Sequence, residues 1–140
     1  MSKTAIVYWS QTGNTEAMAN AVAEGAASAG AAADIYEAEN FSPEKISEYE
    51  AIAFGCPSMG VEVLEETVFR PMWDAVKSGL SGKKIALFGS YGWGDGAWMR
   101  DWEDECKSEG IELVCESVMA NEAPGEDELE KCRELGKALS

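Results

Sequence analysis

Histidine is absent from this 140-residue chain. Without an imidazole the chain has no ordinary general base for a hydrolytic triad and no histidine ligand for a metal ion. The four cysteines, Cys56, Cys106, Cys115 and Cys132, form no Cys-x-x-Cys pair and show no metal-ligand spacing, so we interpret them as free thiols. We therefore expect any chemistry at this protein to come from a bound cofactor.

Basic residues are scarce as well. Eleven lysines and arginines stand against twenty-six aspartates and glutamates, which gives a net charge of -15. This charge repels nucleic acid and anionic membrane surfaces and favours a partner with a basic docking face. No apolar run approaches the roughly 20 residues of a membrane span, and residues 1–4 carry no signal-peptide pattern. We expect a cytoplasmic protein that binds neither nucleic acid nor membranes.

Short apolar runs alternate with helical patterns along the chain. The runs predict strands at 4–9, 51–55, 84–89 and 111–118, with a weaker one at 32–36. Helical spacing predicts helices at 15–29, 65–77, 96–108 and 127–139, with a kink or a fresh start at Pro71. This alternation predicts an α/β fold with a doubly wound, five-stranded parallel sheet and helices on both faces. The length fits one domain over residues 1–140.

The loop Ser10-Gln11-Thr12-Gly13-Asn14-Thr15 joins the first predicted strand to the first predicted helix. A helix N-terminus in this position binds phosphate through backbone N–H groups and the positive end of the helix dipole. The loop adds three hydroxyls and two amide side chains but no cation, and Glu16 follows it. A nucleoside triphosphate loop needs a lysine here, so the sequence predicts a monophosphate held by neutral donors.

Two further loops belong at the same edge, because ligands of doubly wound folds bind beyond the carboxyl ends of the strands. They are Cys56-Pro57-Ser58-Met59-Gly60-Val61-Glu62 and Ser90-Tyr91-Gly92-Trp93-Gly94-Asp95-Gly96. Either loop alone is typical of an ordinary turn. Trp93, on a glycine-rich loop without a core to fill, is predicted to stack on a flat ligand. The other tryptophans, Trp9, Trp73, Trp98 and Trp102, fit core or partly buried positions at strand ends and on helix faces.

Together the motifs resemble those of short-chain flavodoxins from anaerobic clostridia and their relatives. The resemblance rests on the 10–15 loop, on Gly55-Cys56-Pro57-Ser58-Met59-Gly60 and on Leu87-Phe88-Gly89-Ser90-Tyr91-Gly92-Trp93-Gly94, and it runs along nearly the whole chain. It implies the strand order 2-1-3-4-5 and non-covalent FMN with its phosphate in the 10–15 loop. It also implies a monomeric, low-potential one-electron carrier that passes through the semiquinone and hydroquinone states while it shuttles between redox enzymes.

The resemblance also implies roles for single residues. The Met59-Gly60 turn is expected beside flavin N5, Glu62 is expected to accept a hydrogen bond from flavin N3, and Trp93 is expected to flank the ring. Val61 departs from relatives, which often carry a short polar residue there. The full predicted cofactor-binding set is Ser10, Gln11, Thr12, Gly13, Asn14, Thr15, Pro57, Ser58, Met59, Gly60, Val61, Glu62, Ser90, Tyr91, Gly92, Trp93, Gly94 and Asn121, with no catalytic or metal-binding residue.

Other proteins of similar architecture fit less well. A phosphorelay receiver needs clustered aspartates after its first strand, where Trp9 and Ser10 stand, and a low-molecular-weight phosphatase needs a Cys-x5-Arg loop, whereas Cys56 has Glu62 at that spacing. Two alternatives stay open. One is an FMN-dependent quinone or NAD(P)H oxidoreductase of flavodoxin-like fold, and the other is a non-catalytic FMN-binding module.

Overall fold

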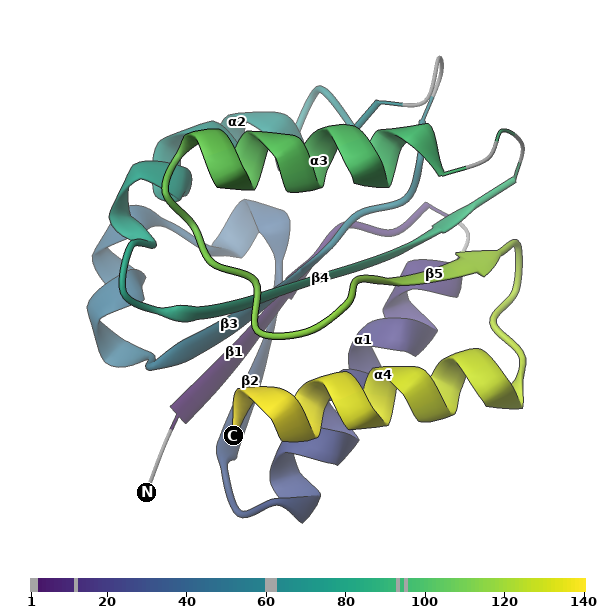
Figure 1. Ribbon diagram of the computed structural model, residues 1–140, viewed down its shortest axis with the longest axis horizontal. Helices are drawn as coiled ribbons and strands as arrows, with labels where there is room; N and C mark the ends of the chain where they lie inside the picture. The colour runs from purple at the N-terminus through teal and green to yellow at the C-terminus, as the bar shows by residue number, and fades with distance from the viewer. Residues whose placement is uncertain (1–2, 12, 60–62, 93, 95) are drawn as a thin grey trace.

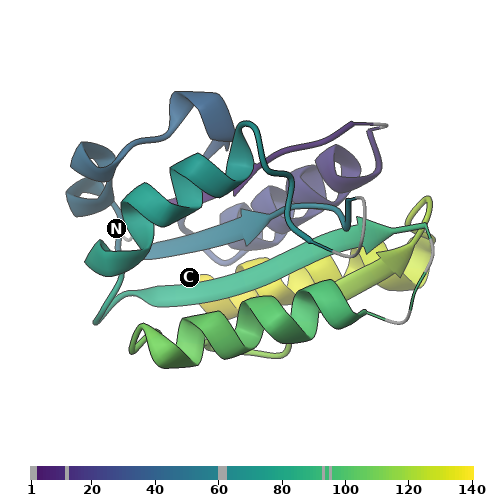
Figure 2. The ribbon, with the colours of Figure 1, turned by 90° about the horizontal axis from the view of Figure 1, so that it is seen from above.

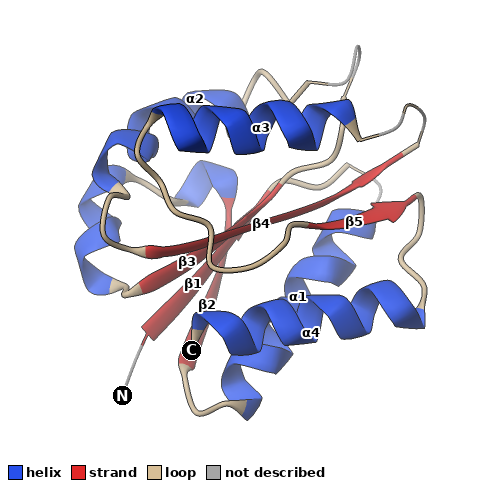
Figure 3. Cartoon of the chain, viewed as in Figure 1, coloured by secondary structure: helices blue, strands red, loops and turns tan. Residues whose placement is uncertain are grey.

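A parallel sheet of five strands forms the centre of the computed structural model, which describes residues 3–11, 13–59, 63–92, 94 and 96–140. The strands are β1 (Lys3–Tyr8), β2 (Ala32–Glu37), β3 (Ala51–Gly55), β4 (Lys84–Tyr91) and β5 (Val118–Asn121). Their order in the sheet is β2-β1-β3-β4-β5, as predicted (Figure 1). Because neighbouring strands run in parallel, their carboxyl ends meet at one edge of the sheet, and the loops that leave them come together there (Figure 3).

Helices cover both faces of this sheet. The helices α1 (Asn14–Ser28) and α4 (Glu126–Leu139) lie side by side on one face, and α2 (Phe69–Val76) and α3 (Ala97–Ser108) lie on the other (Figures 1 and 2). Short 3-10 turns at Ala38–Asn40, Pro43–Glu48 and Lys77–Gly79 connect elements on the α2 side. The doubly wound architecture that the alternating pattern predicted is therefore confirmed.

Alternating side chains of the central strands fill two cores. On β1, Val7 packs into the core under α2 and α3, whereas Ile6 packs into the core under α1 and α4. The helices α1 and α4, which cover the second core, approach each other closely at two glycines. A Cβ on Gly25 would lie 1.9 Å from the carbonyl oxygen of Arg133, and one on Gly136 would lie 2.0 Å from that of Val22. Small residues at these positions bring the two helices together and hold α1 in place beneath its N-terminal loop.

The predicted strand at 111–118 is wrong in its bounds. In the described chain β5 covers only Val118–Asn121, and the preceding segment contributes a single bridge, from Leu113 to Ile85. Val114 donates to the carbonyl oxygen of Ile85 at 3.0 Å, after which the chain leaves the ladder until Val118 pairs with Phe88. Val114 is exposed and Cys115 only half-buried. An apolar run on the sheet edge therefore resembled a strand in sequence without forming one.

The second helix begins four residues later than predicted, at Phe69 rather than at residue 65. Glu65 is instead the residue that receives the free N–H groups at the start of α2. Its carboxylate accepts hydrogen bonds from the backbone N–H groups of Val68 at 2.7 Å and Phe69 at 2.8 Å. Pro71 falls in the first turn of α2, where its missing N–H costs no hydrogen bond within the helix. The predicted fresh start near Pro71 is confirmed.

Candidate functional site

A pocket of about 450 Å³ opens at the carboxyl edge of the sheet, where the loops after β1, β3 and β4 converge. Each loop contributes to its wall, and the loop after β5 closes one side. The described lining residues are Ser10, Gln11, Asn14, Thr15, Pro57, Ser58, Met59, Ser90, Tyr91, Gly92 and Glu122. The predicted meeting of the 10–15, 56–62 and 90–96 loops is thus confirmed for their described residues.

The loop after β1 is arranged as an anion-binding helix start. The Ser10 hydroxyl accepts hydrogen bonds from the N–H groups of Gly13 at 3.1 Å and Glu16 at 3.3 Å. Gly13, the residue before α1, has φ 93°, a left-handed conformation that a side chain would resist. Among the described residues no acceptor engages the N–H groups of Asn14 and Thr15. Those two donors, at the positive end of the α1 dipole, remain available to a bound anion.

Direct hydrogen bonds fix the three loops relative to one another. The buried hydroxyls of Thr15 and Ser90 lie 3.0 Å apart and join the start of α1 to the end of β4. The N–H of Ser58 donates to the carbonyl oxygen of Ser90 at 2.9 Å, which extends the β3–β4 ladder into the pocket wall. Gly89 permits this close approach, since a Cβ there would lie 2.2 Å from the Cys56 carbonyl oxygen. These contacts among the loops themselves therefore define the wall of the pocket.

The loop after β3 is held at both of its described ends. Met59 and Val63 form an antiparallel bridge with hydrogen bonds of 2.8 and 3.0 Å. At the base of the loop, the indole N–H of Trp98 donates to the Cys56 carbonyl oxygen at 3.1 Å. These contacts anchor the segment in which the resemblance places the residues beside the flavin ring.

Glu122 is a pocket residue that the sequence analysis missed. It has φ 56°, and it is the one described non-glycine residue with a positive φ. Its N–H donates to the Tyr91 carbonyl oxygen at 2.7 Å, and the Asn121 side chain donates to the same oxygen at 3.3 Å. These bonds turn the loop after β5 toward the pocket. Glutamate gives no sequence signal for this backbone conformation, which glycine and asparagine adopt more often.

Comparisons with known proteins decide the family. The flavodoxin family model matches residues 6–136. The chain belongs to the flavodoxin family. It is 41% identical to the flavodoxin of Clostridium beijerinckii over 135 residues, which cover 96% of this chain and 97% of that protein. It is also 41% identical to the flavodoxin of Megasphaera elsdenii, covering 96% of each chain.

Solved structures agree with this family. The solution structure of two-electron reduced flavodoxin from Megasphaera elsdenii superposes with a TM-score of 0.89 at 40% identity and covers 97% of each chain. Oxidised flavodoxin 1 from Bacillus cereus superposes with a TM-score of 0.82 at 26% identity, over 99% of this chain and 97% of that one. As a flavodoxin, this chain binds FMN and transfers electrons and is not an enzyme.

The donors present fit the phosphate of FMN. The two available N–H groups at the start of α1 and the polar side chains of Gln11, Asn14 and Thr15 supply neutral hydrogen bonds. The described pocket lining contains no lysine or arginine and a single acid, Glu122. A monophosphate tolerates this environment better than a triphosphate, because it carries less charge to be neutralised. The expectation of a cation-free phosphate site therefore agrees with the described pocket.

Most of the predicted cofactor-binding residues that the structure describes line the pocket. The described exceptions are Gly13, Gly94 and Asn121. Gly13 shapes the helix start and Asn121 holds the Tyr91 carbonyl oxygen, so both act through neighbours. The remaining predicted positions, Thr12, Gly60, Val61, Glu62 and Trp93, lie outside the described residues.

Tyr8 and Cys56, which lie at the ends of β1 and β3, hold their protons more tightly than free side chains do. Burial, and then the hydrogen bond that its hydroxyl donates to Glu16 at 3.0 Å, raise the pKa of Tyr8 to about 12. Burial likewise raises the pKa of the Cys56 thiol well above its ordinary value. Both groups stay neutral at physiological pH and add no charge beside the cofactor loops. This environment suits a carrier whose redox chemistry belongs to its cofactor.

Proposed function

We propose that this flavodoxin is a low-potential carrier that moves one electron at a time between larger redox proteins. The observation that carries the proposal is the pocket at the sheet edge, where N–H groups of α1 without a described acceptor face a described lining that has no basic side chain. FMN, when bound, supplies reversible uptake of one or two electrons. The protein supplies the binding site and the electrostatic field around it.

Specific residues are assigned to parts of the cofactor. Ser10, Gln11, Thr12, Gly13, Asn14 and Thr15 would hold the phosphate. Pro57, Ser58, Met59, Gly60, Val61 and Glu62 would line the reactive side of the flavin ring, with Glu62 accepting a hydrogen bond from N3. Ser90, Tyr91, Gly92, Trp93 and Gly94 would cover the ring from the other loop, and Asn121 would support that loop. The Thr15–Ser90 and Ser58–Ser90 contacts support this division, because they hold the described parts of the three loops at one pocket.

The partners of the carrier are inferred from its charge. A net charge of -15 favours reductases or oxidoreductases that present a basic face, and like charge disfavours self-association, so we assign a monomer. No helix in the described part of the chain is long and apolar enough to cross a membrane. We further assign a single domain over residues 1–140 and a cytoplasmic location, where the four thiols would stay reduced.

A redox titration tests the proposal. The purified protein is loaded with FMN, freed of excess cofactor, and titrated anaerobically with dithionite while its visible spectrum is recorded. We expect one FMN per chain and two separable one-electron steps, with a long-wavelength band that rises and then falls during reduction. A protein that does not retain FMN would contradict the proposal.

A relay assay separates the carrier from the two alternatives. The FMN-loaded protein is placed between an NADPH-dependent flavodoxin reductase and cytochrome c, and cytochrome reduction is followed with and without it. We expect transfer to require both the reductase and the carrier, with slow NADPH oxidation by the carrier alone. Rapid NADPH or quinone turnover without the reductase would indicate an oxidoreductase, and bound FMN without relay would indicate a binding module.

A further inference from the structure

A row of packed aromatic rings leads from the cofactor pocket through the core under α2 and α3. It begins at Tyr91, which lines the pocket and whose ring lies 5.4 Å from that of Trp98. Trp102 follows Trp98 one turn later, about 6 Å along the axis of α3. The ring of Trp102 lies 5.7 Å from that of Trp73 on α2, and all three tryptophans are buried. Oxidisable side chains therefore extend from the cofactor pocket deep into the core.

Two phenylalanines continue this row toward the edge strand β2. The ring of Phe54 lies 5.1 Å from that of Trp73 and 6.4 Å from that of Phe41, which lies 5.4 Å from the ring of Tyr36. Benzene rings are hard to oxidise, so they act here as a densely packed medium through which an electron can tunnel. Tyr36 is half-buried and brings the row to the surface. We call this set the aromatic row: Tyr91, Trp98, Trp102, Trp73, Phe54, Phe41 and Tyr36.

The aromatic row ends in a hydrogen-bonded group of side chains, Tyr36, Tyr49 and Asp34, which we call the Tyr–Asp cluster. The Tyr49 hydroxyl donates to the Asp34 carboxylate at 2.7 Å, so the Tyr36 hydroxyl, 2.6 Å from that of Tyr49, donates to the Tyr49 oxygen. The two rings also meet edge to face, 6.1 Å apart. Tyr49 is buried, whereas Asp34 is exposed. A proton that leaves the buried phenol can therefore reach a carboxylate in contact with water.

The charges around the Tyr–Asp cluster favour loss of an electron and a proton together. Lys3 places its ammonium 5.1 Å from the centre of the Tyr49 ring, and Lys45 places its own 5.5 Å from that of Tyr36. These cations oppose a positive charge on either ring. Burial, and then the hydrogen bonds with Tyr36 and Asp34, raise the pKa of Tyr49, so its phenol is protonated at rest. When its proton can leave, tyrosine is easier to oxidise than tryptophan, so the cluster is the favoured end of the aromatic row.

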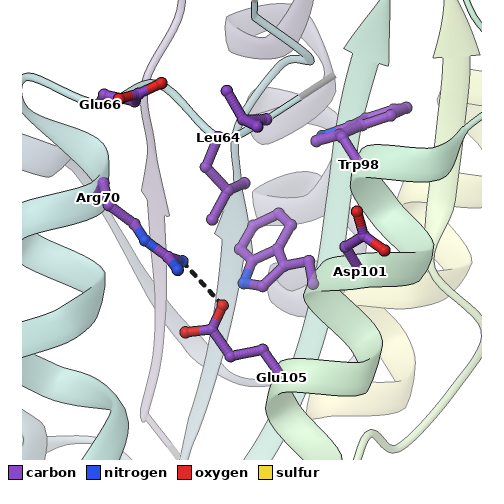
Figure 4. Close-up of a pocket in the computed structure, with 8 residues that line it drawn as sticks. Leu64, Glu66, Arg70, Trp98, Asp101 and Glu105 are labelled. Carbon is purple, nitrogen blue, oxygen red and sulfur yellow. Dashed lines mark hydrogen bonds and ion pairs between the residues drawn. The ribbon is translucent and has the colours of Figure 1, made fainter. Parts of the chain in front are cut away.

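The middle of the aromatic row is polarised in the same direction. The indole N–H of Trp73 donates to the Glu105 carboxylate at 2.9 Å, whereas that of Trp102 has no acceptor among the described residues. Glu105 also pairs with Arg70 at 2.8 Å (Figure 4) and with Lys77 at 2.9 Å, and these cations offset part of its charge. The hydrogen bond to a carboxylate still favours a positive charge on Trp73 over one on Trp102. An electron vacancy on α3 therefore gains by moving to α2, away from the cofactor pocket.

We propose that the aromatic row carries electron vacancies from the cofactor pocket to the Tyr–Asp cluster, and so protects the pocket from oxidative damage when light excites the bound flavin. The oxidant is the excited, oxidised flavin, which takes one electron from Tyr91 or Trp98. Electrons then move along the row toward the pocket until the vacancy reaches Tyr49. There the O–H bond breaks, the proton passes to Asp34, and a neutral tyrosyl radical remains. A soluble thiolate returns one electron to this radical and becomes a thiyl radical, while Asp34 returns the proton.

The test uses the FMN-loaded protein and electron paramagnetic resonance. The protein is illuminated with blue light in the presence of pentaamminechlorocobalt(III), which removes the electron from the reduced flavin irreversibly, and is then frozen. Ring-deuterated tyrosine identifies a tyrosyl radical by its narrowed spectrum. We expect a tyrosyl signal in the parent and its loss in Tyr36→Phe/Tyr49→Phe. The control is Tyr8→Phe, which removes another tyrosine hydroxyl bonded to an acid, Glu16, and should keep the signal.

Two further variants test the route and the proton acceptor. Trp73→Phe interrupts the aromatic row, so the tyrosyl signal should be lost and a tryptophanyl signal should appear in its place. Asp34→Asn removes the proton acceptor at an exposed position and should likewise abolish the tyrosyl signal, whereas Asp127→Asn, at another exposed position, should keep it. Bound FMN absorbance and circular dichroism show whether each variant is folded. If Trp73→Phe does not fold, Asp34→Asn and the tyrosine variants decide the matter.

Several results would overturn the proposal. They are the absence of a tyrosyl radical in the parent, a signal that Tyr36→Phe/Tyr49→Phe leaves unchanged, and a signal that disappears only in Tyr8→Phe or Tyr91→Phe. An unchanged signal in both Trp73→Phe and Asp34→Asn would also contradict it. The inference needs bound FMN but no transfer of electrons between proteins. A protein that relays electrons in the dark but forms no radical at the Tyr–Asp cluster would therefore lose this protective route and keep its proposed function.

Discussion

The hydroxyl groups of Thr15 and Ser90 lie 3.0 Å apart in the buried base of the cofactor pocket, although 75 positions separate them in the chain. Thr15 belongs to the first turn of α1, and Ser90 to the last part of β4. Their contact joins the loop that is assigned to the phosphate of FMN to the loop that is assigned to the flavin ring. This hydrogen bond should therefore contribute both to the stability of the protein and to the shape of the cofactor pocket.

Removing one member of this pair should destabilise the apoprotein. Ser90→Ala leaves the Thr15 hydroxyl buried without its partner, which costs about 1–3 kcal/mol of unfolding free energy. The double variant Thr15→Val/Ser90→Ala should regain part of that loss, because no unpaired hydroxyl remains. Urea denaturation measures both. Ser108→Ala, which removes an exposed hydroxyl bound within α3, serves as the control and should change stability by less than about 0.5 kcal/mol. Equal stability of parent and Ser90→Ala would show that the pair contributes nothing.

Glu65 should make the stability of the protein depend on pH. The residue is only 6% exposed, and burial by itself would raise the pKa of its carboxyl group. Hydrogen bonds from the Thr67 hydroxyl and from the backbone N–H groups of Phe69, Val68 and Thr67 outweigh burial and lower the pKa of Glu65 below its ordinary value. A lowered pKa in the folded state means that the stabilisation is complete above the ordinary value of 4.5 and is lost as the pH falls toward the folded value.

The experiment compares the parent with Glu65→Gln in urea denaturation at several pH values. At pH 7 the variant should be less stable by about 2 kcal/mol, since it loses hydrogen bonds to a charged acceptor. The difference should shrink as the pH falls below 4.5. Glu66→Gln, at an exposed neighbour with no described hydrogen bond, should match the parent throughout. A difference between parent and Glu65→Gln that persists unchanged at low pH would contradict the role given to the charge.

Sequence periodicity sufficed for most of the fold, and its failures have physical causes. The short, fully buried run Ala51–Gly55 forms a strand with the predicted bounds, whereas the strands predicted at 4–9 and 84–89 extend over Lys3–Tyr8 and Lys84–Tyr91. The segment 111–117 is apolar in places but lies along an edge, where solvent can satisfy the backbone in place of a ladder. Glu65 could have been part of the first turn of α2, or it could have preceded the helix and accepted hydrogen bonds from its free N–H groups. The sequence could not distinguish these two positions, because acidic residues are favoured in both.

The candidate site was predictable where strand ends and loops coincide. Ser10, Ser58 and Ser90 were predicted together because Ser10 and Ser58 follow the carboxyl ends of β1 and β3, and Ser90 lies at the end of β4. Glu122 was missed because its place in the wall depends on a left-handed backbone and on a hydrogen bond to Tyr91. Neither feature has a residue pattern of its own.

The Glu122 carboxylate should lower the midpoint potential at which the flavin takes up its second electron. It is the one acid in the described lining of the cofactor pocket, so its charge opposes further negative charge there. A unit charge roughly 10 Å away contributes about 1.7 kcal/mol at an effective dielectric constant of 20, or about 70 mV, and solvent screening reduces this to tens of millivolts. Glu122→Gln should raise the second midpoint by that amount in an anaerobic redox titration, whereas Glu112→Gln, outside the pocket, should leave it unchanged. If the second midpoint potential stays the same in both variants, the charge of Glu122 does not affect the potential of the flavin.

Added salt should raise the same second midpoint potential, because it screens the negative charges over the whole surface of the protein. Uptake of the second electron adds negative charge to a protein whose net charge is already -15. Screening weakens this repulsion, since the Debye length falls from about 30 Å at 0.01 M to about 3 Å at 1 M ionic strength. The second midpoint should therefore rise by tens of millivolts over that range, as measured by redox titration in NaCl. The Glu122→Gln variant should show a shallower rise, because one of the screened charges is gone. A second midpoint that does not depend on salt would mean that packing of apolar groups against the flavin, rather than surface charge, sets the potential.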